Sequence, residues 1–104
     1  MANNLIVELN KSIGMSVEQI HQGLCQRTNN AAPSVADIQQ WLVNSATIPE
    51  WVNKTAALWI IELWMGDRDA CQAGSLLTVD KKYSRILRGF SMAEIISMRQ
   101  QLAS

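Results

Sequence analysis

The sequence predicts an all-α protein, and three observations support this prediction. Apolar residues recur every three or four positions along most of the chain, the spacing that places them on one face of a helix. Ser16, Ser34 and Ser91 each stand three residues before a glutamine, an aspartate or a glutamate, a pattern found at helix N-termini. No stretch alternates apolar and polar residues as a half-buried strand does. We therefore expect a compact bundle of five to six helices.

The composition is that of one globular domain. The chain has 104 residues, of which 48% are hydrophobic and 17% charged, which is enough for a core and unlike a disordered chain. We expect a single domain over residues 1–104, in which a C-terminal helical hairpin (79–103) packs on residues 3–65. The longest apolar run (56–65) is far shorter than the roughly 20 residues of a membrane span. With no secretion-signal pattern at the N-terminus, we expect a cytoplasmic protein that does not associate with a membrane.

The first two helices are predicted from their N-terminal caps. Asn3 or Asn4 can cap a first helix, which extends to just before the first glycine of the chain. Ser16 and Gln19 form a capping box, in which each side chain bonds to the other residue's backbone N–H. The second helix then runs to about Arg27 and is followed by a turn-rich segment.

A third helix opens at Ser34 and runs to about Val43. The fourth helix begins at Pro49, where a proline fits the first turn, and is expected to end at Gly66. It is apolar nearly all round and carries three of the four tryptophans of the chain, so we expect it to be buried on more than one side. The other segments are expected to pack on it, with the tryptophans in the core.

The C-terminal part is less regular at first. Residues 66–78 are expected to form a loop or a short helix. Asp80 can cap a fifth helix that runs to Arg88 and stops at a glycine. Ser91 and Glu94 form another capping box, which opens the last helix.

Charge is balanced overall but not along the chain. The net charge is zero, which weighs against a purely electrostatic polyanion binder. The basic residues cluster at one place only, in the predicted fifth helix, at Lys81, Lys82, Arg85 and Arg88. Three of them, Lys81, Arg85 and Arg88, share one helix face at i, i+4 and i+7; this set is called the basic strip below. Such a strip is typical of a solvated face, of a phosphate-binding surface or of a docking face for an acidic partner.

Catalysis and metal binding have little support in the sequence. His21 is the one histidine of the chain and is expected to be exposed. No nucleophilic residue lies at a spacing from it that would suggest a catalytic pair. Cys25 and Cys71 lack the CxxC spacing of a zinc site and are expected to be buried free thiols. Glycine-rich phosphate loops and metalloprotease motifs are absent from the sequence. We expect neither an enzyme nor a bound cofactor or metal.

Three patterns follow one another in the first half of the chain. A serine-capped second helix is followed by Ile38-Gln39-Gln40-Trp41 in the third helix, and Ile48-Pro49 opens the fourth, with Asn44-Ser45 between them. Over residues 5–60 this succession resembles the lambda-repressor-like (Cro or XRE) helix-turn-helix transcriptional regulators. The spacing from Trp41 to Ile48-Pro49 is most similar to small phage or bacterial regulators with a WxxxxxxIP pattern.

The resemblance implies a helix-turn-helix with a lengthened turn at Thr28–Pro33, whose third helix enters the major groove of double-stranded DNA. Ile38 and Trp41 would then face the core. The base-facing positions that it implies are Ser34, Val35, Asp37, Gln39 and Gln40. Contacts to phosphates would come from Ser34, Gln19, Arg27, Lys54 and the basic strip of Lys81, Arg85 and Arg88. The function so implied is sequence-specific DNA binding by a transcriptional regulator of the repressor type.

A second interpretation stays open. The third helix has no Arg or Lys and carries Asp37, which phosphates repel, while the net charge is zero. These features favour a small helical adaptor or inhibitor that binds a protein partner without DNA. Its contacts would come from the tryptophan-rich helix or from the basic C-terminal helix.

A homodimer is expected under the DNA-binding interpretation. The predicted fourth helix carries more apolar surface than a bundle of this size covers easily, and a two-fold contact through it and the last helix would bury that surface. Two copies would also read two half-sites.

Overall fold

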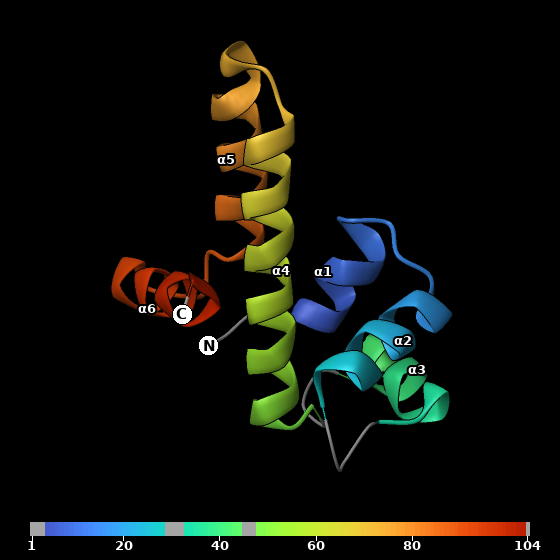
Figure 1. Ribbon diagram of the computed structural model, residues 1–104. Coiled ribbons are helices and arrows are strands. Elements are labelled where there is room, and N and C mark those ends of the chain that lie inside the picture. The colour runs from blue at the N-terminus through green and yellow to red at the C-terminus, as the bar shows by residue number, and fades with distance from the viewer. Residues whose placement is uncertain (1–3, 29–32, 45–47, 104) are drawn as a thin grey trace. The chain divides into compact units, whose positions relative to one another are not determined.

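The computed structural model describes residues 4–28, 33–44 and 48–103, and helices are the regular secondary structure of this part of the chain (Figure 1). It contains six α-helices, a short 3-10 turn and no strand, so the all-α prediction is confirmed. The elements are α1 (Leu5–Lys11), α2 (Val17–Arg27), α3 (Val35–Val43), α4 (Glu50–Ala70), the 3-10 turn η2 (Ala73–Ser75), α5 (Leu76–Ile86) and α6 (Met92–Ala103). The helices group into two compact units, and the boundary between the units falls inside α4. The N-terminal unit is Asn4–Ala56, and the C-terminal unit begins at Ala57.

The predicted N-terminal caps of the first two helices are present where the structure describes them. The Asn4 side chain accepts a hydrogen bond from the Val7 N–H at 3.2 Å and so caps α1. Both bonds of the Ser16 capping box form, with the Gln19 side chain 2.9 Å from the Ser16 nitrogen. The alternative cap at Asn3 lies outside the described residues. Hydrogen bonds between residues close in sequence therefore determine where α1 and α2 begin.

The N-terminal unit has an apolar core shared by its first three helices. Six aliphatic side chains on α1, α2 and α3 are at most 1% exposed: Leu5, Ile6, Leu9, Ile20, Leu24 and Ile38. Two asparagines add hydrogen bonds between elements. Asn4 donates to the Trp41 carbonyl oxygen at 3.0 Å, and the Asn53 side chain at the start of α4 accepts from the Leu5 N–H at 3.0 Å. Apolar burial and two backbone-directed bonds thus hold the unit together.

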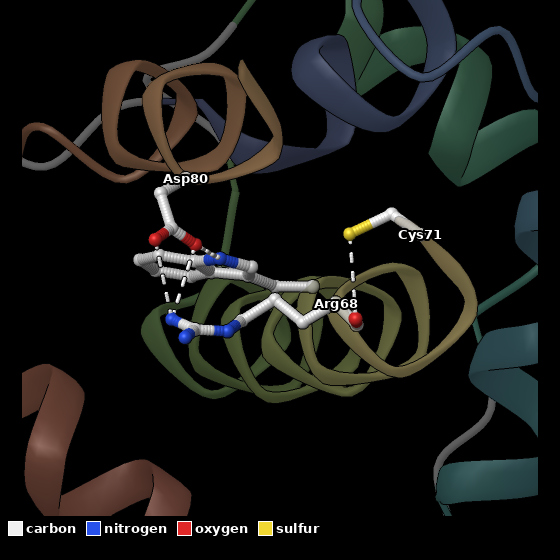
Figure 2. A network of polar contacts seen from close by, with 4 residues as sticks. Arg68, Cys71 and Asp80 are labelled. Atoms are coloured by element: carbon white, nitrogen blue, oxygen red, sulfur yellow. Dashed lines mark hydrogen bonds and ion pairs between the residues drawn. The ribbon is translucent and has the colours of Figure 1, made fainter. Parts of the chain in front are cut away.

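The C-terminal unit is built around a polar and aromatic contact between α4 and α5, which run side by side (Figure 1). Asp80 on α5 accepts from the Trp64 indole N–H at 2.8 Å and forms an ion pair with Arg68 at 3.2 Å (Figure 2). The Cys71 thiol donates to the Arg68 carbonyl oxygen at 3.3 Å (Figure 2). The Trp64 ring stacks on Tyr83 with centroids 5.9 Å apart. We call Trp64, Arg68, Asp80, Tyr83 and Asp67 the α4–α5 network.

Tyr83 completes this network from the interior. Its side chain is 2% exposed, and its hydroxyl donates to the Asp67 carboxylate. Burial raises the pKa of Tyr83 above its ordinary value, and the Asp67 carboxylate raises it further because a phenolate there would be repelled. On the third helix of the unit, Arg99 of α6 lies over the Trp64 ring at 5.4 Å.

Two boundaries differ from the sequence prediction. Gly66 does not end the fourth helix, which continues to Ala70. An interior glycine costs a helix only about 1 kcal/mol, and the contacts of Asp67 and Arg68 with α5 favour the extra turn. Residues 66–78, expected to be a loop or a short helix, are thus mostly helical, because α5 already starts at Leu76.

Asp80 was predicted to cap the fifth helix, and that prediction is wrong. Asp80 lies inside α5, and its carboxylate binds Trp64 and Arg68 instead of backbone N–H groups of its own helix. The residue before α5, Ser75, makes no side-chain cap bond. The helix also ends at Ile86, so Arg88 lies beyond it.

The last helix begins as predicted. Ser91 and Glu94 form both bonds of a capping box, at 3.0 and 3.2 Å. The Ser91 backbone N–H, which donates to the Glu94 carboxylate at 3.0 Å, holds the pKa of Glu94 below its usual value because it stabilises the charged form.

The tryptophans divide into two groups. Trp41, Trp59 and Trp64 are each 7% exposed, which confirms the prediction that they belong to the core. Trp51, in the first turn of α4, is 44% exposed, so the prediction is wrong for this tryptophan. None of the helices that the structure describes has the length and apolarity needed to cross a membrane.

Candidate nucleic-acid interface

The candidate interface is the outer face of α3, and it depends on how that helix is held. Ser34 and Asp37 form a reciprocal capping box: the Ser34 Oγ accepts from the Asp37 N–H, and the Asp37 carboxylate accepts from the Ser34 N–H, both at 3.1 Å. The helix therefore starts at a fixed residue, which is what positions side chains in the turns that follow.

The inner face of α3 is apolar. Ile38 is fully buried and Trp41 is 7% exposed, so both turn into the core of the N-terminal unit as predicted. The Trp41 carbonyl oxygen also accepts the bond from Asn4. Because these two residues lock the helix against α1 and α2, they also decide which side of α3 faces solvent.

The predicted base-facing residues lie mostly on the solvent side. Ser34, Asp37, Gln39 and Gln40 are exposed, whereas Val35 is only half-exposed. The two glutamine side chains make no hydrogen bond to any residue that the structure describes. The Asp37 carboxylate is engaged by the Ser34 backbone and is the only charged group of α3. Asp37 therefore takes part in the N-terminal cap together with Ser34. The side-chain amides of the two glutamines remain available for hydrogen bonds to a ligand.

Two further exposed residues share the face of the glutamines. Ala36 and Val43 are exposed, and with Gln39 and Gln40 they occupy positions i, i+3, i+4 and i+7. This spacing places all four on one side of a helix. We call Ala36, Gln39, Gln40 and Val43 the outer face of α3. The sequence prediction missed Ala36 and Val43, although their spacing from the glutamines could have identified them.

The predicted phosphate contacts in the same unit differ in availability. Lys54 is exposed on α4. Arg27 is half-buried, and its guanidinium donates to the Gly23 carbonyl oxygen at 3.0 Å. The Gln19 carbonyl oxygen is engaged in the Ser16 capping box, which leaves its NH₂ group to donate. Of these three, Lys54 is the residue best placed to offer a charge.

The basic strip belongs to the C-terminal unit. Lys81 and Arg85 are exposed on α5, and Arg88 is exposed in the turn that follows it. None of the three forms an ion pair with a residue in the described part of the chain. The neighbouring Lys82 lies 5.3 Å from the Tyr83 ring. Because Arg88 is outside the helix, the strip is not the continuous helical face that the sequence predicted.

Two turns of the predicted helix-turn-helix lie partly outside the described residues. The structure does not describe residues 29–32 of the lengthened turn at Thr28–Pro33, nor Ser45 of the Asn44-Ser45 pair. The flanking residues are described: Thr28 caps the end of α2, and Asn44 caps the end of α3.

The histidine and the cysteines form no larger cluster. His21 is half-buried rather than exposed, because its ring lies 3.5 Å from the Cys25 sulfur one turn along α2. Cys25 and Cys71 are half-buried free thiols rather than fully buried ones. Within residues 4–28, 33–44 and 48–103, no three His, Cys, Asp or Glu side chains are grouped so as to hold a metal ion.

Comparisons of the chain with protein-family models, with curated proteins and with solved structures found no match.

Proposed function

We propose that the protein is a sequence-specific DNA-binding transcriptional regulator of the repressor type, which reads the major groove with α3. The observation that carries this proposal is the division of α3 into two faces. Ile38 and Trp41 are buried against the unit, while Gln39 and Gln40 are exposed on the opposite side without a partner among the described residues. A helix held in this way fits the width of the major groove.

The chemistry of the exposed amides supports base recognition. The amide of a glutamine side chain can donate to adenine N7 and accept from the adenine N6 amine. This bidentate pairing is a common specific contact in the major groove. The absence of Arg and Lys from α3 is compatible with this role, because base edges are neutral while phosphates attract cations. Each bidentate pair contributes about 1–3 kcal/mol of discrimination.

Phosphate contacts come from outside α3 in this proposal. Ser34, Gln19, Arg27 and Lys54 are the candidates in the N-terminal unit, and the basic strip supplies three further cations. Each neutralised phosphate steepens the dependence of log K on log salt concentration by roughly 0.9. Replacing Lys81, Arg85 and Arg88 with glutamine should therefore flatten the measured slope by up to about 2.7 if all three contact DNA.

A homodimer is part of the proposal. Most of the apolar residues of α4 are buried within one copy, and Val52, Ile60 and Ile61 are fully buried, so little of that helix is left for a partner. The exposed apolar residues Met92 (70%) and Ile96 (46%) lie one turn apart on α6 and are the better candidates for a two-fold contact. Light scattering should give twice the mass of one chain, and a monomer at tens of micromolar would contradict the dimer.

The test is selection of bound sequences from a random duplex-DNA pool at roughly physiological salt. The wild-type protein should enrich a palindrome whose half-sites lie about one helical turn apart. The double variant Gln39→Ala/Gln40→Ala should lose that preference while keeping its fold, because neither side chain is buried. A matched control is Gln72→Ala/Gln100→Ala, which removes two exposed glutamines of the C-terminal unit and should leave the enriched sequence unchanged.

Two results would contradict the proposal. Retention of DNA that is weak, salt-sensitive and without any enriched sequence would remove sequence-specific binding altogether. An enriched site that the Gln39→Ala/Gln40→Ala variant binds with unchanged affinity would show that α3 is not the reading helix.

A second candidate function rests on the basic strip. Lys81, Arg85 and Arg88 are exposed and form no ion pair with a described residue, which suits an acidic protein partner as well as a phosphate. In that case the protein is a helical adaptor or inhibitor. Neutralising the strip would then abolish binding of the partner, while the Gln39→Ala/Gln40→Ala variant would bind it normally.

A further inference from the structure

Val43 is an unusual residue for the end of an amphipathic helix. Its side chain is 89% exposed, the largest exposed fraction among the large apolar residues that the structure describes. A single exposed apolar residue needs no special explanation. Val43, however, shares its side of α3 with Ala36, and the two exposed glutamines lie between them.

The outer face of α3 therefore combines two amides with aliphatic groups and carries no charge. Gln39 and Gln40 offer donors and acceptors, and Ala36 and Val43 offer methyl groups at either end of the face. This surface suits base edges better than phosphates, which attract cations. In the major groove the apolar group of the four natural bases is the C5-methyl of thymine, and alanine and other aliphatic side chains are its usual partners.

We propose that the outer face of α3 reads A·T base pairs, with Val43 in contact with a thymine methyl beside an adenine bound by Gln39 or Gln40. Ala36 contacts a second thymine methyl at the other end of the face. This inference rests on the proposed DNA-binding function and names the class of site, a half-site in which adenine and thymine steps adjoin. Val43 is then a specificity-determining residue.

The test uses the duplex that the full-length protein enriches. Each thymine of one half-site is replaced in turn by uracil, which removes the methyl group and leaves the Watson–Crick pair unchanged. Uracil at the position that Val43 contacts should weaken binding about four-fold, the factor expected for losing the burial of one methyl-sized apolar group. Uracil at positions outside the contact should have no effect.

The variant Val43→Ala makes the assignment specific to one residue. It should bind the thymine site a few-fold more weakly and should no longer distinguish thymine from uracil at the position concerned, because one partner of the contact is already gone. Such non-additive behaviour identifies groups that touch. Because Val43 is 89% exposed, the substitution should leave the circular dichroism spectrum and the melting temperature unchanged.

Leu77→Ala is the matched control. Leu77 is a 66% exposed aliphatic residue of the C-terminal unit, and its loss should change neither affinity nor uracil sensitivity. The inference is overturned if the enriched site lacks adjoining A·T pairs, if no uracil weakens binding, or if Val43→Ala keeps the full uracil effect. In each of these cases the enriched site still supports the proposed function. Failure to enrich any sequence overturns both.

Discussion

The N-terminal unit holds its helices with apolar side chains and two asparagines, whereas the C-terminal unit also commits charged and aromatic side chains to the contact between its helices. In the first unit, Ile38 and Trp41 are buried and the glutamines of α3 face solvent. In the second, Asp80 binds Trp64 and Arg68. A polar side chain that is satisfied internally is not available to a ligand. The difference leaves the Gln39 and Gln40 amides of α3 exposed to solvent, while Asp80 and Arg68 bind residues of their own unit.

The largest effect expected from breaking this arrangement is in the apolar core of the N-terminal unit. Ile38 is fully buried, so Ile38→Ala should lower the free energy of unfolding by about 2–5 kcal/mol through lost burial and a cavity. Val43→Ala, on the exposed side of the same helix, is the control and should change it by less than about 0.5 kcal/mol. Urea denaturation measures both, and equal effects would contradict the division of α3 into two faces.

The next effect is in the α4–α5 network. Asp80→Ala removes the acceptor of the Trp64 N–H and the ion-pair partner of Arg68. We expect the free energy of unfolding to fall by about 1–3 kcal/mol, because Trp64 is buried and its N–H would lose its hydrogen-bond partner. Asp69→Ala, at an exposed carboxylate of the same region, should cost less than about 0.5 kcal/mol. A thermal melt in which the two variants behave alike would show that the network contributes little.

Tyr83 makes the stability of the C-terminal unit depend on alkaline pH. Its pKa is raised in the folded chain, so the phenol contributes its full stability below about pH 10, the ordinary value, and loses it as the pH rises further. Through this one group, the free energy of unfolding cannot fall by more than about 1.4 kcal/mol per pH unit. Since Tyr83 is the only tyrosine of the chain, tyrosinate absorbance reports its ionisation directly.

The control for this titration is Tyr83→Phe. This variant should lose the part of the alkaline destabilisation that comes from the phenol. Ionisation of Tyr83 at its ordinary pKa in the folded protein would show that burial and the Asp67 carboxylate do not stabilise the neutral phenol.

The smallest effect is at a glycine that the helix tolerates. Gly66 lies within α4, and an added Cβ would meet nothing within 4 Å. Gly66→Ala should therefore raise the free energy of unfolding by about 0.5–1 kcal/mol, since alanine loses less conformational entropy in a helix. Gly14→Ala is the opposite case, because Gly14 has a φ of +90° that favours glycine, and it should destabilise the protein. Stabilisation by both substitutions would show that the positive φ of Gly14 does not disfavour alanine at that position.

The features predicted correctly from the sequence are those set by neighbouring residues. The capping boxes at Ser16, Ser34 and Ser91 involve partners three residues away, so their pattern is visible in the chain itself. The split of α3 into a buried side with Ile38 and Trp41 follows from helical periodicity.

The features that were missed depend on residues distant in sequence. Asp80 was read as a cap because its partner Trp64 lies 16 residues earlier, and the same contact region allows α4 to pass Gly66. Val43 was named only as the approximate end of the third helix and was not assigned to a face of it. Its helical spacing from Gln39 and Gln40 is visible in the sequence, whereas its exposed fraction of 89% is given by the structure.

The most direct test of the central claim is a titration of ¹⁵N-labelled protein with the enriched duplex, followed through the side-chain amide signals of the glutamines. The signals of Gln39 and Gln40 should shift or broaden at stoichiometric DNA, while those of Gln72 and Gln100 in the C-terminal unit should stay in place. Shifts confined to the C-terminal unit, with the α3 glutamines unaffected, would contradict the assignment of α3 as the reading helix.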